Sequence, residues 1–428
     1  MHQVYTKLRP YLYKVGVLQL ARKLVSKRLR TQIASWFGLD GVDLYHNYER
    51  YLPPREQPSP VVFDGLNFFA DFEVALGTGE AARQLRQAIQ TTDISLATVQ
   101  IDLGFKVTQT TDLSPKECPY HIHLVHINPP EIPHAMELIL NQVVSDRYLI
   151  AYWHWELGHF PKKWATLANY FDEIWVASNF IKNQLQTQFP NTPVKRVALP
   201  VNISTSREDS SLWQNRFVFL TTFSPTSNVA RKNPFGTIEA FRRAFADDVT
   251  PPLLVVKTHH LDSDYGRLVK EPLQEAVAQV NGVLIEDTLE REAVAQLFAR
   301  CNCLVSLHRA EGFGFPIAEA MALGKPVICT GYSGNMDFTH PDNSFLVDFH
   351  LRAITEEDHV YYPPMRRVYP IGEIWAEPNL DHAAQLMRRV YDDPAMAQLA
   401  GQQGQQTILT EYSHQHIGRV IQQRLNEL

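Results

Sequence analysis

Short apolar runs alternate with amphipathic segments through most of this chain. In the first half, apolar runs that predict buried strands span residues 61–63, 94–101, 121–127, 148–153, 173–177 and 194–199. Segments that predict helices lie between or after them, at 79–90, 133–141, 162–171 and 179–189. This alternation is typical of a parallel, doubly wound α/β sheet with helices on both faces.

The second half repeats the pattern after a polar stretch at 204–211. Its predicted strands are 217–223, 253–257, 283–285, 303–307 and 326–329, and its predicted helices are 233–245, 289–300, 316–323 and 380–391. We therefore predict a basic amphipathic segment over 1–40 and two Rossmann-like domains over 41–203 and 204–405. A final helix over 406–428 is expected to pack back on the first domain. Two such domains face each other across a central cleft at the carboxyl ends of their strands, where ligands of this fold class bind.

Length, charge and cysteines narrow the class of protein. A chain of 428 residues is too long for one compact core. The net charge of −6 argues against broad nucleic-acid binding, which needs a strongly basic face. The four cysteines complete no zinc motif, and we interpret them as buried reduced thiols of a cytoplasmic protein.

The first 39 residues carry eight Lys and Arg side chains and no acid. A helix over 17–31 could rest on an anionic membrane, such as the inner face of the plasma membrane. It could equally well pack on its own domain. Both interpretations stay open.

Residues 303–338 hold the most informative chemistry. A buried strand is followed by Glu311, and Gly312 and Gly314 permit close approach of the backbone to a ligand. Pro316 favours a helix start, whose free amides can hold a phosphate. Glu319 lies about one turn into that helix, and its carboxylate could accept two hydrogen bonds from the vicinal diol of a sugar.

Glu311 and Glu319, within Glu-Gly-Phe-Gly-Phe-Pro-Ile-Ala-Glu-Ala-Met-Ala-Leu-Gly-Lys-Pro-Val, resemble the E-x7-E motif of retaining glycosyltransferases of family four. The resemblance implies the GT-B fold, with the acceptor held by the first domain and a nucleotide sugar by the second. It also implies that Glu311 contacts the donor sugar and that Glu319 holds the ribose diol. Gly312, Phe313, Gly314 and Phe315 are then expected to line the donor site.

Further positions match this family. Arg231 and Lys232 resemble the basic pair that grips the donor diphosphate, with Lys232 neutralising the leaving phosphate. A lysine at a helix start in solvent is the alternative interpretation of Lys232. Gly77 and Gly79 resemble a glycine-rich loop that faces the diphosphate and the acceptor.

Three more groups of residues are candidates for the same site. Ser333 and Gly334 follow a strand and could line the phosphate or the sugar. His126 and His154 each follow an apolar run, and relatives often carry a first-domain histidine near the reacting sugar. For His154, core packing and sugar stacking are equally plausible. His308 and Arg309 stand directly before Glu311 and could also contact the donor.

The predicted function is sugar transfer with retention, from a UDP- or GDP-type donor to a glycan or lipid-linked acceptor in polysaccharide or glycolipid synthesis. No cofactor or metal is expected, because Asp262-Ser263-Asp264 lies far from the motifs above. A GT-B epimerase, a phosphorylase, or an inactive binding scaffold recruited to membranes are the alternatives.

Overall fold

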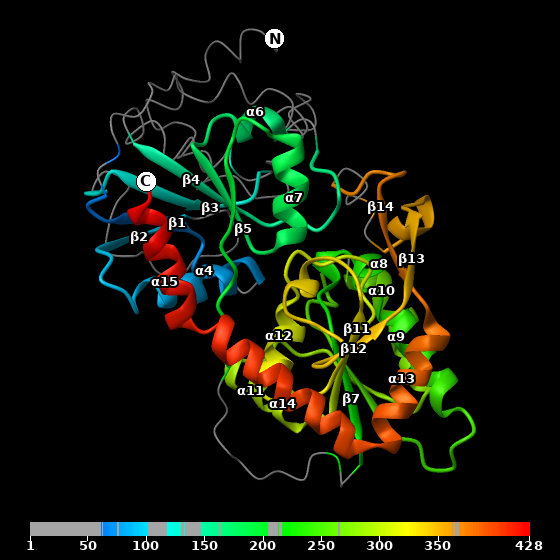
Figure 1. Cartoon of the computed structure of the whole chain (residues 1–428). Coiled ribbons are helices and arrows are strands. Elements are labelled where there is room, and N and C mark those ends of the chain that lie inside the picture. Colours follow the sequence, from blue (N-terminus) through cyan, green and yellow to red (C-terminus); the bar gives the residue numbers. More distant parts are fainter. Residues whose placement is uncertain are drawn as a thin grey trace, which may run out of the picture.

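The computed structural model describes residues 61–428, apart from positions 62, 75–76, 102–117, 130–131, 133–146, 162–163, 204–212, 214–215, 264–265, 362 and 364–367. Two units, each built around one parallel sheet, contain most of the described helices and strands (Figure 1). The predictions for the segment 1–40 and for a helix at 133–141 lie outside the described residues, and so does the polar stretch at 204–211.

The first unit has a six-stranded sheet in the order β2-β1-β3-β4-β5-β6. The strands are all parallel and are β1 (Leu66–Ala70), β2 (Leu96–Gln100), β3 (Ile122–His126), β4 (Tyr148–Trp153), β5 (Glu173–Val176) and β6 (Val194–Arg196). The helices described in this unit are α4 (Gly77–Ile89), α6 (Ala165–Ala168) and α7 (Asn179–Gln188). The strand order reverses between β1 and β3, so these strands frame the position where open α/β sheets bind ligands.

The second unit has a six-stranded parallel sheet in the order β12-β11-β10-β7-β8-β9, which is the Rossmann order. Its strands are β7 (Val218–Thr222), β8 (Leu253–Lys257), β9 (Val283–Ile285), β10 (Cys303–Ser306), β11 (Val327–Thr330) and β12 (Phe345–Val347). Its main helices are α8 (Val229–Lys232), α9 (Pro234–Phe245), α10 (Gly266–Gln279), α11 (Arg291–Arg300), α12 (Phe315–Ala322) and α13 (Leu380–Asp392). Here the order reverses between β7 and β10.

Both faces of each sheet are covered, which explains the continuous apolar runs in the sequence. Along β7, Val218 and Leu220 join one buried cluster with α11 and α12, whereas Phe219 joins another with α9, α10 and α13. In the first sheet, Phe68 packs on the side of α4 and Phe69 on the side of α6 and α7. A small antiparallel sheet of β13 (Phe349–Ala353) and β14 (Ile374–Pro378) lies beside the second unit (Figure 1).

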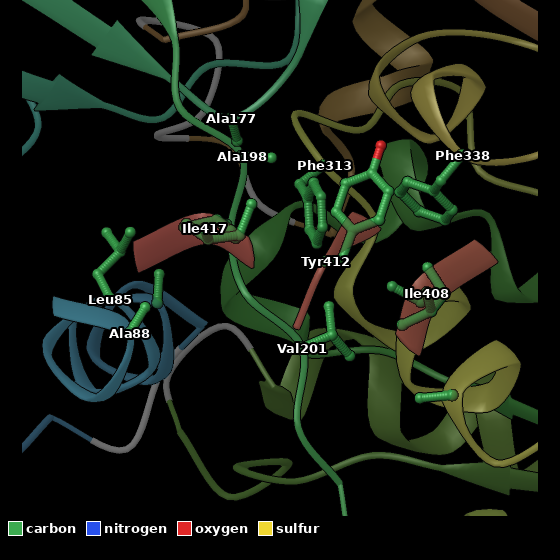
Figure 2. Packing of buried hydrophobic residues seen from close by; sticks show 14 of the residues in the cluster. Leu85, Ala88, Ala177, Ala198, Val201, Phe313, Phe338, Ile408, Tyr412 and Ile417 are labelled. Carbon is green, nitrogen blue, oxygen red and sulfur yellow. The ribbon is translucent and has the colours of Figure 1, made fainter. Parts of the chain in front are cut away.

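The chain passes between the two units again near its end. Helix α14 (Pro394–Glu411) lies on the second unit, where Gln405 donates a hydrogen bond to the carbonyl of Ala322 at 2.9 Å. Helix α15 (His414–Asn426) packs on α4 of the first unit, with Ile417 beside Leu85 and Ala88 (Figure 2). The two passages lie side by side, because the amide of Val201 donates to the carbonyl of Tyr412 at 2.8 Å.

Most predicted elements occur in the structure, with some exceptions. The predicted strand at 61–63 is wrong: the described residues there are not extended in a sheet, and β1 begins at Leu66 instead. The helix predicted at 162–171 is reduced to the four residues of α6. The sequence analysis did not identify α10, α14, β12, β13 or β14.

All four cysteines are buried thiols that form no disulfide, as predicted. Within the described residues, no helix combines the length and the apolar character that a bilayer crossing requires.

Candidate functional site

The candidate site begins at the switch point of the second sheet, where the chain leaves β7 and β10. These two strands are parallel neighbours, so the segments that follow them emerge at the same edge. The segment after β7 leads to α8, which ends with Arg231 and Lys232. The segment after β10 carries Glu311. The fold therefore brings together residues that lie 79 positions apart in the sequence.

Two asparagines in left-handed conformations position the short helix α8. Asn228 has φ +68° and accepts a hydrogen bond from the amide of Arg231 at 3.2 Å, which caps the start of the helix. Asn233 has φ +53° and donates to the carbonyl of Leu307 at 2.9 Å, which ties the end of α8 to the exit of β10. Asparagine tolerates this conformation better than most residues.

Lys232 and Glu311 form an ion pair between the lysine Nζ and the carboxylate Oε1. The guanidinium of Arg231 lies 3.5 Å from the other carboxylate oxygen of Glu311. Arg231 is only 4% exposed and is held by hydrogen bonds to the carbonyls of Ala310 at 2.8 Å and Ser227 at 3.0 Å. Two cations thus converge on one buried carboxylate.

The charges of Lys232 and Arg231 determine the protonation state of Glu311. Burial alone would raise the pKa of Glu311, but the positive charges of Lys232 and Arg231 outweigh it and bring the pKa to about 2. Burial lowers the pKa of Lys232 despite the opposing effect of Glu311. For Arg231, burial would lower the pKa, but Glu156, Tyr369 and Glu311 raise it. The carboxylate is ionised at neutral pH, and the two bases concentrate positive charge beside it.

The first unit contributes a second carboxylate that sequence reasoning missed. Glu156, just after β4, lies 3.5 Å from the guanidinium of Arg231. Tyr369, from the segment between β13 and β14, donates a hydrogen bond to the other oxygen of Glu156 at 2.8 Å. The aromatic ring of Tyr369 stacks on Trp155 with a centroid separation of 5.7 Å. Glu156 therefore links the two units at the candidate site.

The turn after Glu311 is packed closely against two other backbones. A Cβ on Gly312 would lie 2.4 Å from the carbonyl oxygen of Trp155 in the first unit. A Cβ on Gly334 would lie 2.2 Å from the carbonyl oxygen of Gly312. Ser333 has φ +76°, and its hydroxyl accepts a hydrogen bond from the amide of Glu311 at 2.8 Å. Ser333 and Gly334 thus support the Glu311 turn.

Helix α12 starts at this turn. Gly314, with φ +99°, is its N-cap residue and supplies no side chain to cap the amides. An uncapped helix start favours binding of an anion such as a phosphate. Phe315 is the first residue of the helix. Phe313 can offer a donor only its backbone, because its ring is buried against Phe338 and Tyr412 (Figure 2).

Replacing Gly312 with alanine is expected to lower the turnover of the predicted sugar transfer by about 100-fold. The reason is that the new methyl group would force the backbones of the two units apart. Displacements near 1 Å have effects of this size on catalysis. Steady-state kinetics and the thermal unfolding midpoint would measure the change. Gly158→Ala is the control, since a Cβ there meets only the Gln184 side chain, at 4.0 Å. Unchanged activity of the Gly312 variant would mean that this contact is unimportant.

Glu319 lies on α12 but is placed in a different network. Its carboxylate oxygen Oε1 is 2.6 Å from the guanidinium of Arg291, the first residue of α11. Arg291 also approaches Glu80 of α4 at 3.5 Å. Lys232 pairs with Glu311, whereas Glu319 pairs with Arg291, so the two predicted carboxylates have different cations as partners.

His126 and His154 are brought together at the carboxyl ends of β3 and β4. Their Nε2 atoms are 2.8 Å apart, so one ring donates a hydrogen bond to the other. Burial lowers the pKa of His154 to about 4, and burial together with the charge of His154 lowers the pKa of His126. The pair is neutral at pH 7. His154 directly precedes Trp155, whose carbonyl contacts the Gly312 turn.

Because the folded-state pKa of His154 lies below that of an exposed histidine, acid should destabilise the protein. Between the ordinary value of 6.5 and about 4, the unfolded chain binds a proton that the folded protein does not. From pH 7 to pH 5 this residue alone should lower the free energy of unfolding by about 2 kcal/mol. Urea unfolding at both pH values would show a smaller loss in His154→Asn. A variant with the full loss would contradict this; the exposed His350→Asn is the control.

Several residues predicted to line the site have other surroundings in the structure than the sequence analysis expected. Gly77 and Gly79 form the first turn of α4 and not a glycine-rich loop, and a Cβ on Gly79 would meet the carbonyl of Val74 at 2.2 Å. His308 is buried, and both of its ring nitrogens are hydrogen-bonded within the protein, Nε2 to Asn335 at 3.0 Å and Nδ1 to Ser306 at 3.1 Å. Arg309 pairs with Glu377 at 2.7 Å and also bonds to a backbone carbonyl. We therefore assign His308 and Arg309 to the support of the site.

Within the described ranges, no group of three or more His, Cys, Asp or Glu side chains is arranged to hold a metal ion.

Known proteins resemble this chain in one stretch of its sequence and in its fold. Residues 223–356 match the family model of the glycosyl transferases group 1. This stretch contains Arg231, Lys232, Glu311, Glu319 and the Ser333 turn. No curated protein sequence matches the chain.

Solved structures match over most of the chain. Sucrose-phosphate synthase from Thermosynechococcus elongatus has a TM-score of 0.63 at 13% identity, covering 85% of this chain and 98% of its own. Anabaena HepE in complex with UDP has a TM-score of 0.59 at 17% identity, covering 85% and 100%. A glycosyltransferase from Rickettsia africae has a TM-score of 0.60 at 12% identity, covering 85% and 98%. The predicted fold class is thereby confirmed: the chain has the GT-B fold, and its residues 223–356 match the model of the glycosyl transferases group 1.

Proposed function

We propose that this protein is a retaining glycosyltransferase that moves a hexose from a UDP-type nucleotide sugar to an acceptor hydroxyl. The observation that carries the proposal is the convergence of Lys232 and Arg231 on Glu311, next to the uncapped start of α12. Cations and free amides are what a departing diphosphate needs, because negative charge grows on its oxygens as the glycosidic bond breaks.

The residues have distinct roles in this proposal. Lys232 and Arg231 neutralise the leaving diphosphate, together with the amides at Gly314 and Phe315. Glu311, ionised at neutral pH, accepts hydrogen bonds from hydroxyls of the donor sugar. Glu319 accepts hydrogen bonds from the ribose diol.

The first unit holds the acceptor in this scheme. The neutral His126–His154 pair can donate a hydrogen bond to a sugar hydroxyl without adding charge. The amides of the first turn of α4, which contains Gly77 and Gly79, face the diphosphate from this unit. As the bond between the anomeric carbon and the phosphate oxygen breaks, the acceptor oxygen bonds to that carbon on the same side. Its proton passes to the leaving phosphate oxygen, so no separate base or metal is required.

We infer a uridine nucleotide from solved structures that share the fold. Anabaena HepE, which shares the fold, has been solved with UDP and with UDP-glucose. The TarM structure from Staphylococcus aureus, at a TM-score of 0.53 and 15% identity, also contains UDP. For the acceptor, we propose a glycan or lipid-linked molecule of polysaccharide or glycolipid synthesis. The basic segment 1–39, which lies outside the described residues, favours work at the inner face of the plasma membrane.

A thermal-shift screen with UDP-, GDP- and ADP-sugars would first identify the donor. Release of the nucleoside diphosphate is then measured with and without a panel of glycan acceptors, and the anomeric configuration of the product is read by NMR. We expect UDP release that depends on the acceptor and a product of retained configuration. Conversion of the donor sugar without acceptor would favour an epimerase, and absence of donor binding would favour a scaffold.

A further inference from the structure

Arg291 occupies a junction between the two units that the proposed roles do not use. It is the first residue of α11, and its Nη1 lies 2.6 Å from Glu319 Oε1 in α12. Its Nη2 lies 3.5 Å from Glu80 Oε1 in α4 of the first unit. The same nitrogen donates to the carbonyl of Asn202, in the segment that joins the units, at 3.3 Å. One guanidinium thus contacts both units and their connection.

The two carboxylates that flank Arg291 depend on it to different degrees. Glu80 has partners on its own helix: Arg83 at 2.9 Å and Gln84 at 2.7 Å. The side chain of Glu319 is only 8% exposed, and Arg291 is its ion-pair partner in the described part of the chain. A buried carboxylate without a counter-charge is costly. The contact of Arg291 with Glu319 is shorter than that with Glu80, and Glu319 is more deeply buried. Both observations indicate that Arg291 mainly stabilises Glu319.

The pairing leaves Glu319 able to bind a ligand. An ionised carboxylate has about four acceptor positions on its two oxygens, and the guanidinium of Arg291 occupies one of them at Oε1. The other positions can accept hydrogen bonds from the hydroxyl groups of a ligand. A diol can therefore bind while the ion pair remains intact.

We propose that Arg291 is a positioning residue for donor binding: by pairing with Glu319 Oε1 it holds this carboxylate ionised and oriented toward the ribose diol. The inference rests on the proposed function. Arg291 itself touches no reacting atom in this scheme. It acts through Glu319, and its contact with Glu80 is secondary.

The charges around Glu319 predict how the pairing would be seen in solution. Burial raises the pKa of Glu319, Arg291 opposes this increase, and the negative charge of Glu80 adds to it. Without Arg291 the pKa of Glu319 would rise further, and a larger fraction of the carboxyl would be protonated at any given pH. A protonated carboxyl accepts hydrogen bonds from a diol less well. Donor affinity should then recover as the pH increases.

Calorimetric titration of UDP-glucose from pH 5 to pH 9 tests the inference. Its diphosphate is esterified at both ends and does not titrate in this range, and any titration of the uracil ring near pH 9 affects the parent and the variants alike, so the difference between them reports the protein. We expect Arg291→Ala to weaken binding roughly tenfold at pH 7, with a smaller loss at pH 9. Arg291→Lys should recover most of the affinity, since it keeps the positive charge. Circular dichroism and the thermal midpoint check that each variant is folded.

Two further variants separate the alternatives. Glu80→Gln removes the charge of Glu80 and weakens its contacts with Arg291 and Arg83, but it leaves the Arg291–Glu319 pair intact and should change affinity by less than about twofold. In a Glu319→Gln background, Arg291→Ala should have little further effect, because the ion pair between the two residues is already lost there. An equal loss in that background, or a loss in Glu80→Gln as large as in Arg291→Ala, would overturn the inference in favour of a bridge between the units.

The proposed function and this inference can fail separately. If the parent protein binds UDP-glucose and transfers sugar while Arg291→Ala binds as tightly at every pH, only the role of Arg291 is wrong. If the parent protein neither binds UDP-glucose nor transfers its sugar, the proposed donor is wrong, and the role of Arg291 in binding it is overturned as well.

Discussion

Turnover is expected to fall about 100-fold or more when Lys232 is replaced with alanine, whereas the protein stays folded. The ammonium of Lys232 is the positive charge closest to Glu311 and the proposed neutraliser of the leaving diphosphate. Preorganised groups of this kind typically contribute factors of about 100 to 1,000 to the rate. Arg231 remains 3.5 Å from Glu311, so the buried carboxylate keeps a partner in the variant.

The measurement is kcat with the donor at saturation, together with the affinity for UDP-glucose. Lys270→Ala is the matched control, because Lys270 on α10 also pairs with a carboxylate, but with Glu286, at 3.1 Å, and not with Glu311. A Lys232 variant that transfers sugar at the parent rate would rule out the leaving-group role. It would favour the alternative that Lys232 only supports the turn.

Replacing Glu319 with alanine is expected to raise KM for the nucleotide sugar by roughly ten- to 100-fold, with a smaller change in kcat. Hydrogen bonds to charged groups contribute about 1.5–3 kcal/mol, and those to the ribose are formed equally in the bound substrate and in the transition state. The fold should tolerate the change, since Arg291 is 42% exposed and can turn to Glu80.

Initial rates over a range of donor concentrations separate KM from kcat. Glu275→Ala, an exposed acid on α10, is the control for the loss of one negative charge in the same unit. If the Glu319 variant lost kcat and kept the parent KM, the carboxylate would act on the reacting centre and not on the ribose.

Several of the strands that sequence analysis found are buried on both faces. Tyr148–Trp153 and Leu253–Lys257 read as continuous apolar runs, and the structure has strands with these bounds. Strand β1 was missed because Asn67 interrupts its apolar run. The buried amide of Asn67 donates to the carbonyl of Tyr120 at 2.7 Å, a contact that only the folded chain provides.

Other elements were missed for equally local reasons. Strand β13 is largely exposed and is stabilised by pairing with β14, so its sequence lacks a buried pattern. Helix α10 contains Pro272, and proline inside a segment usually predicts the end of a helix.

Only the part of the candidate site that lies in one continuous stretch of sequence could be predicted. Glu311 and Glu319 lie in one continuous motif of glycine, proline and acids, which is visible in the sequence alone. Glu156, Tyr369 and Arg291 reach the site from separate elements, and nothing in their neighbouring residues indicates what they contact. The sequence also could not show that Glu319 has its own cation, because that pairing depends on how α11 and α12 pack.

The return of the chain to its first half has a consequence for dissecting the molecule. Residues 61–203, expressed alone, would leave the side of α4 that contains Leu85 and Ala88 facing water, since Ile417 and Ile421 come from the far end of the sequence. A stable first half would therefore need the peptide 413–428 supplied in trans or fused by a linker. A single cut in the sequence therefore does not separate the two units into independently stable fragments.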